Sequence, residues 1–272
     1  MNIQKLKQAA YEIRNDVLAM GRSTGNIGAH MGGGLSMVEI MAALYAGVMT
    51  IDSKNPTAEN RDRFILSKGH GAITLYAALC HAGFISHELL ETFKSNETFL
   101  YGHPSMNPEI GIEFSSGSLG QGLSLGVGVC LGLKRKNNSD SRAFVLMGDG
   151  ECDEGSVWES AASASHYKLN NLVAVIDCNG IQYDGATEEV LSMNSMAQKW
   201  KSFGFEVYEV DGHDVEKLAE ALDKRTDKPR AVIAHTVKGK GVSFMENDPK
   251  WHNNRLTAQL YEQALSEQEA VK

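Results

Sequence analysis

The sequence lacks the features that mark several classes of protein. Its four cysteines lie far apart and form no C-x-x-C pair, which argues against a zinc knuckle and a disulfide framework. Basic residues are in the minority, with 26 Lys and Arg against 34 Asp and Glu, so we expect no nucleic-acid partner. The longest apolar stretch, Leu123 to Leu133, is short and contains three glycines, so no segment is predicted to enter a membrane.

The first twenty residues combine charges of both signs with apolar residues at helical spacing, which is not the pattern of a signal peptide. Together with the unpaired cysteines, this favours a reducing, cytoplasmic location. A chain of 272 residues is long enough to bury one large core, and no Pro- or Ser-rich linker divides it. We therefore expect a single domain over residues 1–272.

Strands and helices are predicted to alternate in the second half of the chain. The pattern gives strands at 143–147, 172–177, 205–210 and 230–235, and helices at 156–167, 193–202 and 214–223. Earlier segments predict helices at 3–20, 36–48, 69–81 and 87–94, a short strand at 63–67, a glycine-rich loop at 23–34 and a long loop at 95–117. This alternation indicates an α/β fold of three layers, α/β/α, with a mostly parallel central sheet.

Two strand ends carry the most unusual residues. The strand at 143–147 runs into Gly148-Asp149-Gly150, and the strand at 172–177 is followed by Asn179-Gly180-Ile181. Ligands bind beyond the carboxyl ends of parallel strands, where a helix beginning near Gly155 would also direct free N–H groups at an anion. A divalent cation would have to stand between that anion and Asp149, and oxygen ligands suit Mg²⁺. Taken singly, each motif is more typical of a simple turn.

Taken together, GDG followed by Asn resembles the thiamine-diphosphate motif, and the segment GDGECDEGSVWESAASASHYKLNNLVAVIDCNG resembles transketolase. The likeness extends to GAHMGGGLS, DRFILSKGHGAITLYAAL, YGHP, SSGSLGQGLSLGVG and TVKGKGVSFMENDPKWH, so it covers nearly the whole chain. The resemblance implies a thiamine-diphosphate-binding fold, transfer of a two-carbon ketol unit from a ketose to an aldose, and a divalent cation, Mg²⁺ or else Ca²⁺ or Mn²⁺.

The resemblance also implies roles for individual residues. The metal ligands would be Asp149, Asn179 and the main-chain carbonyl of Ile181. Cofactor contacts would come from His70, Gly117, Ser118, Leu119, Gly148, Asp149, Gly150, Glu151, Asn179, Ile181, Lys238 and His252. The catalytic set would be His30, His70, His103, Glu154 and His252.

Within these sets, His30 and His103 would contact the sugar, His70 would bridge cofactor and substrate, and His252 would lie near the diphosphate. A histidine in such a loop, taken singly, is more often a structural or surface residue. Leu119 would press the cofactor into its bent shape. Ser118 could also cap the following helix, and Glu154 would lie at a subunit contact unless it is only a favourable acid at a helix start.

Four positions depart from the family pattern: Ala29 and Met31 stand where Gly and Pro are usual, Ser118 where Pro is frequent, and Asn253 where Gly is usual. We expect Met31 and Asn253 to lie near the sugar and to affect the choice of substrate. Two other features are interpreted as structural. The Gly126-x-Gly128 pair lies within a helical pattern rather than in a dinucleotide fingerprint, and close helix packing explains both glycines better. His213 precedes a helix that Asp214 can cap, and Gly204 can end the helix before it.

Transketolase resemblance further implies a second half that supplies the catalytic glutamate and the aromatic cradle for the cofactor ring. We therefore expect a separate C-terminal subunit, an α₂β₂ assembly and sugar phosphate substrates. Two alternatives remain open from the residues alone. One is the α subunit of a thiamine-diphosphate-dependent 2-oxo acid dehydrogenase, and the other is a non-catalytic nucleotide- or flavin-binding module.

Overall fold

A parallel sheet forms the centre of the molecule. The computed structural model describes residues 2–138 and 140–270, and these residues form a five-stranded sheet in the order β1-β2-β3-β5-β4. The strands are β1 (Arg63–Leu66), β2 (Ala143–Gly148), β3 (Leu172–Cys178), β4 (Glu206–Asp211) and β5 (Arg230–His235). Each adjacent pair is parallel, so the carboxyl ends of all five strands lie along one edge.

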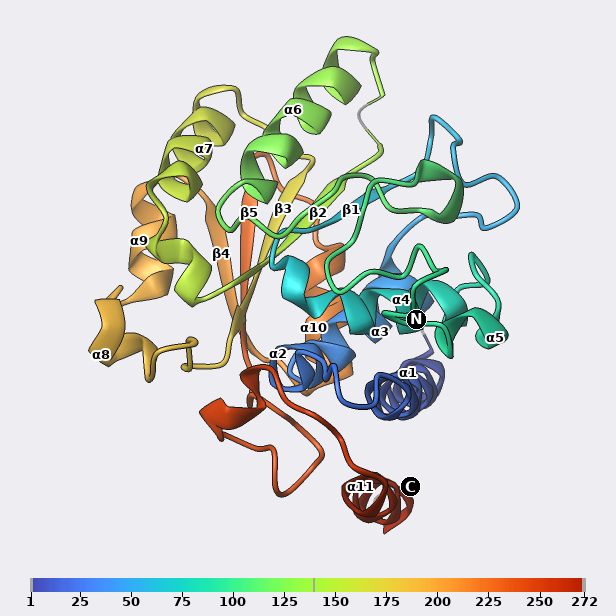
Figure 1. Ribbon diagram of the computed structural model, residues 1–272. Helices are drawn as coiled ribbons and strands as arrows, with labels where there is room; N and C mark the ends of the chain where they lie inside the picture. The colour runs from blue at the N-terminus through green and yellow to red at the C-terminus, as the bar shows by residue number, and fades with distance from the viewer. Residues whose placement is uncertain (1, 139, 271–272) are drawn as a thin grey trace.

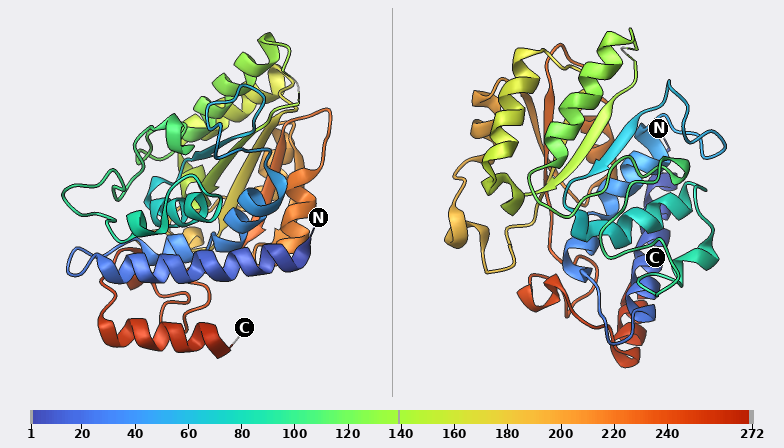
Figure 2. Two further views of the ribbon diagram at one scale, coloured as in Figure 1. Left: turned by 90° about the vertical axis from the view of Figure 1, so that its right-hand side faces the viewer. Right: turned by 45° about the horizontal axis from the view of Figure 1, so that its top comes forward.

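Helices cover both faces of the sheet, which confirms the three-layer α/β/α prediction (Figures 1 and 2). One face carries α6 (Gly122–Arg135), α7 (Gly155–His166) and α9 (Met196–Ser202). The other carries α1 (Ile3–Ser23), α3 (Val38–Ala43), α4 (Ala72–His81) and α10 (Val215–Asp223). The shorter helices are α2 (Met31–Leu35), α5 (His87–Leu90) and α8 (Thr187–Leu191), and α11 (Ala258–Ala270) packs beside α1.

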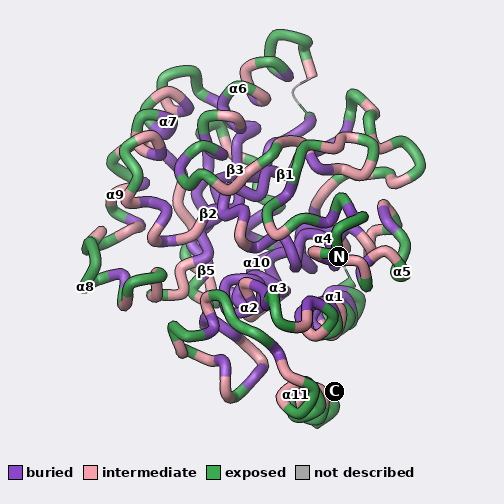
Figure 3. The backbone as a smooth tube through the Cα atoms, viewed as in Figure 1, coloured by how far each residue is buried: buried purple, intermediate pink, exposed green. Residues whose placement is uncertain are grey.

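The sheet divides the apolar core into two clusters. The strands between them are largely buried (Figure 3). Along β2, Phe144 and Leu146 join one cluster, whereas Val145 and Met147 join the other. This division follows from strand geometry, because successive side chains point to opposite faces. The continuous run of apolar residues in β2 and β3 is therefore explained by burial on both sides.

Several predicted boundaries shift where the backbone turns left-handed. The helix predicted at 87–94 ends at Leu90, and Lys94 has φ of 60°. The helix predicted at 193–202 begins only at Met196, because Asn194 has φ of 53° and the Ser195 side chain caps the helix by accepting from the Gln198 amide. The glycine-rich loop contains the short helix α2, which the sequence did not predict.

Local signals at other helix ends were read correctly. Asp214 caps α10 by accepting from the amides of Glu216 and Lys217, and Gly204, with φ of 87°, follows the end of α9. Ser118 is not a cap, which corrects that prediction: α6 begins at Gly122, and no side chain caps it. None of the helices in the described ranges is both long and apolar enough to cross a membrane.

Candidate active site

The loops that follow β1, β2, β3 and β5 enclose a pocket of about 390 Å³ at the carboxyl edge of the sheet. Strand register brings the loops together, because Gly148 of β2 is paired with Asp177 of β3, and Asp177 with Ala234 of β5. The pocket is lined by every residue of the sequence-predicted set except Ser118 and Glu154. Residues more than 200 positions apart in the chain thus meet at one site.

Asp149 is the buried carboxylate of this site. It accepts hydrogen bonds from the amides of Gly150 (2.9 Å) and Gly180 (2.7 Å), and Gly180 reaches it by adopting φ of 74°. Burial raises the pKa of Asp149 in spite of these two donors. A cation beside the carboxylate would offset that cost of desolvation, and none of the described side chains forms a salt bridge with it.

Two further oxygen donors flank Asp149. The Oδ1 atom of Asn179 accepts from the Ile181 amide (3.2 Å), and the Ile181 carbonyl accepts from the Lys238 ammonium (2.8 Å). Both oxygens retain a lone pair in these contacts. A carboxylate, an amide oxygen and a main-chain carbonyl form the type of donor set that suits a hard divalent cation.

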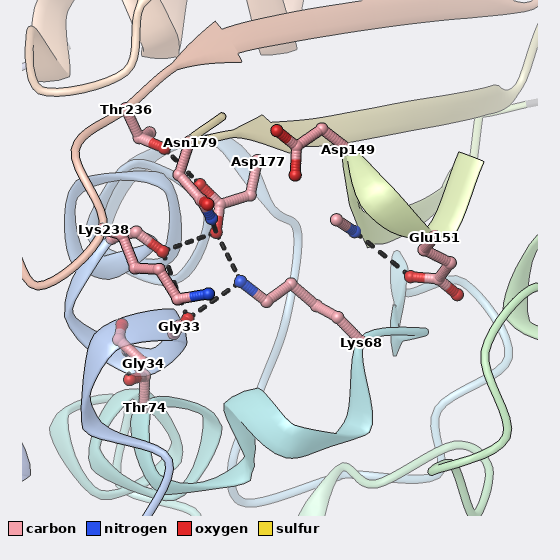
Figure 4. Close-up of polar contacts among 12 residues, drawn as sticks. Gly33, Gly34, Lys68, Thr74, Asp149, Glu151, Asp177, Asn179, Thr236 and Lys238 are labelled. Carbon is pink, nitrogen blue, oxygen red and sulfur yellow. Dashed lines mark hydrogen bonds and ion pairs between the residues drawn. The ribbon is translucent and has the colours of Figure 1, made fainter. Parts of the chain in front are cut away.

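A buried ion pair supports the floor of the pocket. Lys68, which follows β1, forms a salt bridge with Asp177 at the end of β3, and Lys68 also donates to the Gly33 carbonyl (2.8 Å) (Figure 4). Asp177 accepts from the hydroxyls of Ser36 (2.6 Å) and Thr236 as well. Burial alone would raise the pKa of Asp177, but Lys68 and the hydroxyl donors outweigh it and hold the pKa below its usual value.

Lys238 brings a second cation to the same pocket. Its ammonium lies 3.2 Å from Nδ1 of His252 as well as 2.8 Å from the Ile181 carbonyl. Burial, reinforced by the charge of Lys68, lowers the pKa of Lys238 to about 8. The lowered pKa means that the pocket disfavours the charged form of Lys238. An anion bound beside the ammonium would stabilise that charged form.

Four imidazole rings, those of His30, His70, His103 and His252, lie close together in the same pocket as Lys68 and Lys238. The ring centroid of His30 lies 5.7 Å from that of His70 and 5.5 Å from those of His103 and His252. Burial lowers the pKa of all four, and the neighbouring rings and lysines add to the effect in His30 and His252, whose pKa falls to about 4. At neutral pH each ring therefore offers one donor and one acceptor to a polar ligand.

Glu151 lines the pocket as part of its framework. Its carboxylate accepts from the Ser67 hydroxyl and from the amides of Gly120 (2.8 Å) and Gly148 (3.1 Å). These contacts join the end of β1, the loop before α6 and the end of β2. Glu151 therefore fixes the relative position of three segments that build the site.

The remaining predicted residues lie at or beyond the rim. Leu119 is partly exposed and lines the pocket mouth. Ser118 lies in an adjoining open depression that it shares with His103 and Gly117. Glu154 is exposed at the start of α7, next to Gly120, and does not line the pocket.

The expectation for Met31 is wrong, whereas that for Asn253, which is exposed directly after the pocket residue His252, stays a prediction. Met31 is fully buried, with its sulfur packed close to Gly21 of α1, and neither residue lines the pocket. Helix α2 explains this outcome, because Met31 is its first residue and turns inward while His30 faces the cavity.

Sequence reasoning missed Lys68, Asp177 and Tyr183, all of which take part in or border the site. Lys68 and Asp177 are a charged pair with side chains 1% and 0% exposed. Their signal was an acid at the end of an otherwise apolar strand and a lysine at the end of another. Tyr183 lies in the loop after β3, and its ring stands 5.1 Å from that of His252.

Comparisons with known proteins give a consistent result. Residues 6–267 match the family described as "Transketolase, thiamine diphosphate binding domain". One of the subunits of the apulose-4-phosphate transketolase of Phocaeicola vulgatus is 44% identical over 88% of this chain and 85% of its own length. The 6-deoxy-6-sulfo-D-fructose transketolase subunit SqwG of a Clostridium species is 41% identical over 88% of each chain.

The crystal structure of transketolase from Campylobacter jejuni superposes with a TM-score of 0.90 at 29% identity. The alignment covers 99% of this chain but 43% of that transketolase. The chain therefore spans less than half the length of the solved transketolase it resembles, whereas it spans most of the length of the two subunits.

Proposed function

Because this chain belongs to the transketolase family, whose thiamine diphosphate-binding domain it carries, we propose that it binds thiamine diphosphate and Mg²⁺ as one subunit of a two-chain transketolase. The observation that supports this most strongly is that one pocket contains both a buried carboxylate and a buried ammonium whose charged forms are disfavoured. Among the described residues, neither Asp149 nor Lys238 forms a salt bridge, and four neutral imidazoles line the same pocket. The cation of a metal diphosphate would stabilise the carboxylate of Asp149, and its phosphate groups would stabilise the ammonium of Lys238.

The metal ligands from this chain are Asp149, Asn179 and the carbonyl of Ile181; Ca²⁺ or Mn²⁺ could replace Mg²⁺ with the same oxygen donors. Lys68 and Lys238 supply positive charge to the diphosphate. Gly148, Gly150, Gly117 and Leu119 shape the walls around the cofactor, with Ser118 at the rim, and Glu151 holds those walls together. The chemistry that thiamine diphosphate supplies when bound is a nucleophilic carbon able to accept and release a two-carbon ketol unit.

The histidine cluster performs the proton and hydroxyl chemistry of the substrate. His30 and His103 lie together at one side of the pocket, where their neutral rings can donate to a sugar carbonyl and accept from a hydroxyl. The ring of His70 neighbours both that of His30 (5.7 Å) and that of His252 (5.3 Å), and His252 is held next to Lys238, so we assign to His70 contacts with both cofactor and sugar. The low pKa of these rings keeps them available as bases near neutral pH.

A separate C-terminal transketolase subunit is proposed to complete the site, in an α₂β₂ assembly. Two relatives are named as subunits of transketolases, and the chain spans 43% of the solved transketolase. Glu154 is exposed outside the pocket and is our candidate for the subunit contact. The four cysteines have free thiols, which suits our placement of the pair in the cytoplasm.

The substrates are proposed to be ketoses that carry an anionic group, and aldose acceptors. The two relatives are named for a phosphorylated and for a sulfonated sugar. The test is a coupled assay of the purified chain together with its partner subunit, with thiamine diphosphate, Mg²⁺, a panel of ketose phosphates and an aldehyde acceptor. Ketol transfer by the pair is expected. Turnover of pyruvate with no turnover of any ketose would contradict the proposal and favour a 2-oxo acid dehydrogenase.

Calorimetry on the chain tests cofactor binding separately from turnover. Heat from thiamine diphosphate binding is expected in the presence of Mg²⁺ and is expected to disappear when EDTA removes the metal. A flavin titration serves as the control for a non-catalytic carrier. Flavin binding that ignores EDTA, without any binding of thiamine diphosphate, would overturn the assignment.

A further inference from the structure

His213 connects helix α3 to the loop that follows β5. It follows β4 and precedes α10, and its side chain is 15% exposed. Nδ1 lies 2.9 Å from a carboxylate oxygen of Glu39 in α3, and Nε2 accepts a hydrogen bond of 2.8 Å from the Val237 amide. Because an amide N–H only donates, Nε2 must be unprotonated and the ring proton must lie on Nδ1, pointing at Glu39.

Glu39 is itself fixed in place. It forms a salt bridge with Arg14 of α1, and both side chains are about nine-tenths buried. The imidazole of His213 is thus held on one side by a buried ion pair, with its free lone pair directed at Val237. This arrangement determines both the position of the ring and its tautomer.

Val237 belongs to a strap of four residues, 236–239, that runs from the end of β5 along the pocket wall. The Thr236 amide donates to the Cys178 carbonyl (3.1 Å), and the Gly239 amide donates to the Gly32 carbonyl (3.0 Å). Between these two main-chain contacts, the Val237 amide is bound by the side chain of His213. The next residue, Lys238, extends into the pocket (Figure 4).

We propose that His213 is a positioning residue for the cofactor site: by accepting from the Val237 amide, it fixes the strap and so places the Lys238 ammonium beside the Ile181 carbonyl and the diphosphate. The inference rests on the proposed function and adds to it a residue outside the pocket. His213 does not line the pocket; it lines a separate depression together with Arg14 and Glu39, so it would act on the cofactor only through the strap. The sequence pattern indicated only that His213 precedes a capped helix.

Hydrogen exchange on the ligand-free chain tests the strap without any ligand. In His213→Ala the Val237 amide loses its acceptor, so amides 237–239 are expected to exchange at least about 10-fold faster than in the wild type, which corresponds to about 1.4 kcal/mol. His213→Gln is expected to recover most of the protection, because its amide carries both a donor and an acceptor. His235→Ala is the control. His235 directly precedes the strap, and its exposed Nε2 lies 3.2 Å from the carboxylate of Glu209.

Binding of thiamine diphosphate with Mg²⁺ then tests the link to Lys238. With the chain and its partner subunit, His213→Ala is expected to raise Kd about 10-fold, while His235→Ala leaves it unchanged. In a Lys238→Met background the same His213→Ala change should have no further effect, because His213 acts through that ammonium. A merely structural role would give equal losses in both backgrounds.

The outcomes separate this inference from the proposed function. Unchanged exchange at 237–239 in His213→Ala, or additive losses of affinity in the double variant, would overturn the role of His213 even if the wild type binds the cofactor. Absence of thiamine diphosphate binding by the wild type, with the expected loosening of the strap, would instead overturn the proposed function and with it the cofactor part of the inference.

Discussion

The buried pair Lys68–Asp177 provides a quantitative test of how the site is supported. Their side chains are 1% and 0% exposed, so neither charge is hydrated in the folded chain. Asp177→Leu leaves the Lys68 ammonium buried without its counter-ion, and breaking a buried pair in this way costs about 3–5 kcal/mol. Since the whole free energy of unfolding of a domain is about 5–15 kcal/mol, this loss is at least about a fifth of the stability of the ligand-free chain and is readily measurable.

Lys68→Met should cost less, about 1–3 kcal/mol, because Asp177 keeps the hydroxyl donors of Ser36 and Thr236. The double variant replaces both charges by apolar groups of similar size, which is often nearly neutral. It should therefore be more stable than Asp177→Leu alone. Urea unfolding of the ligand-free chains at pH 7, followed by circular dichroism, measures all three values.

The matched control is Lys136→Met, which removes an exposed pair with Glu59 at 3.0 Å and side chains 66% and 82% exposed. That change should stay within about 1 kcal/mol of the wild type. Destabilisation of the double variant by the sum of the two single losses, or a loss below about 1 kcal/mol for Asp177→Leu, would refute the argument.

Three further predictions address other parts of the site. Asp149→Ala should abolish Mg²⁺-dependent binding of thiamine diphosphate in calorimetry, whereas His103→Ala should spare binding and lower turnover; equal loss of both properties would show that His103 is misplaced. Binding should take up protons and weaken above pH about 8, because the ligand-free pKa of Lys238 is lowered to about 8 and an anion raises it again; identical binding heats in buffers of different ionisation enthalpy at pH 8.5 would contradict this. Gly126→Ala should destabilise the chain, because its new methyl meets a side chain of β2 at 2.5 Å, whereas Gly128→Ala has open space and should stabilise α6 by up to about 1 kcal/mol; the reverse order of melting temperatures would refute the packing argument.

The contrast between those two glycines shows how far sequence reasoning reaches. The pattern correctly placed both on a helix, but it attributed both to close packing, and only Gly126 needs it. Strand positions were predictable because β2 and β3 are apolar runs of strand length bounded by turn residues. Helix ends were less so, since positive φ at Lys94 and Asn194 depends on the surroundings of each residue.

Most of the residues in recognisable motifs line one pocket, as the sequence predicted, whereas the residues whose position depends on packing were not predicted. Asp149 and Asn179 follow two adjacent strands, so their proximity followed from parallel topology alone. Asp177 belongs to no recognisable motif. Its role depends on being buried next to Lys68, and this contact cannot be read from the sequence. Met31 was misplaced for the same reason, because the inward turn of α2 depends on its packing against α1.

The central claim is that a divalent cation between Asp149, Asn179 and the Ile181 carbonyl holds thiamine diphosphate in the pocket beside Lys238. A crystal structure of the chain with its partner subunit, thiamine diphosphate and Mg²⁺ tests this most directly. We expect metal density within about 2.0–2.2 Å of these three oxygens, with the diphosphate completing its coordination. A cofactor bound elsewhere, with no metal at the Asp149–Asn179 corner, would contradict the account.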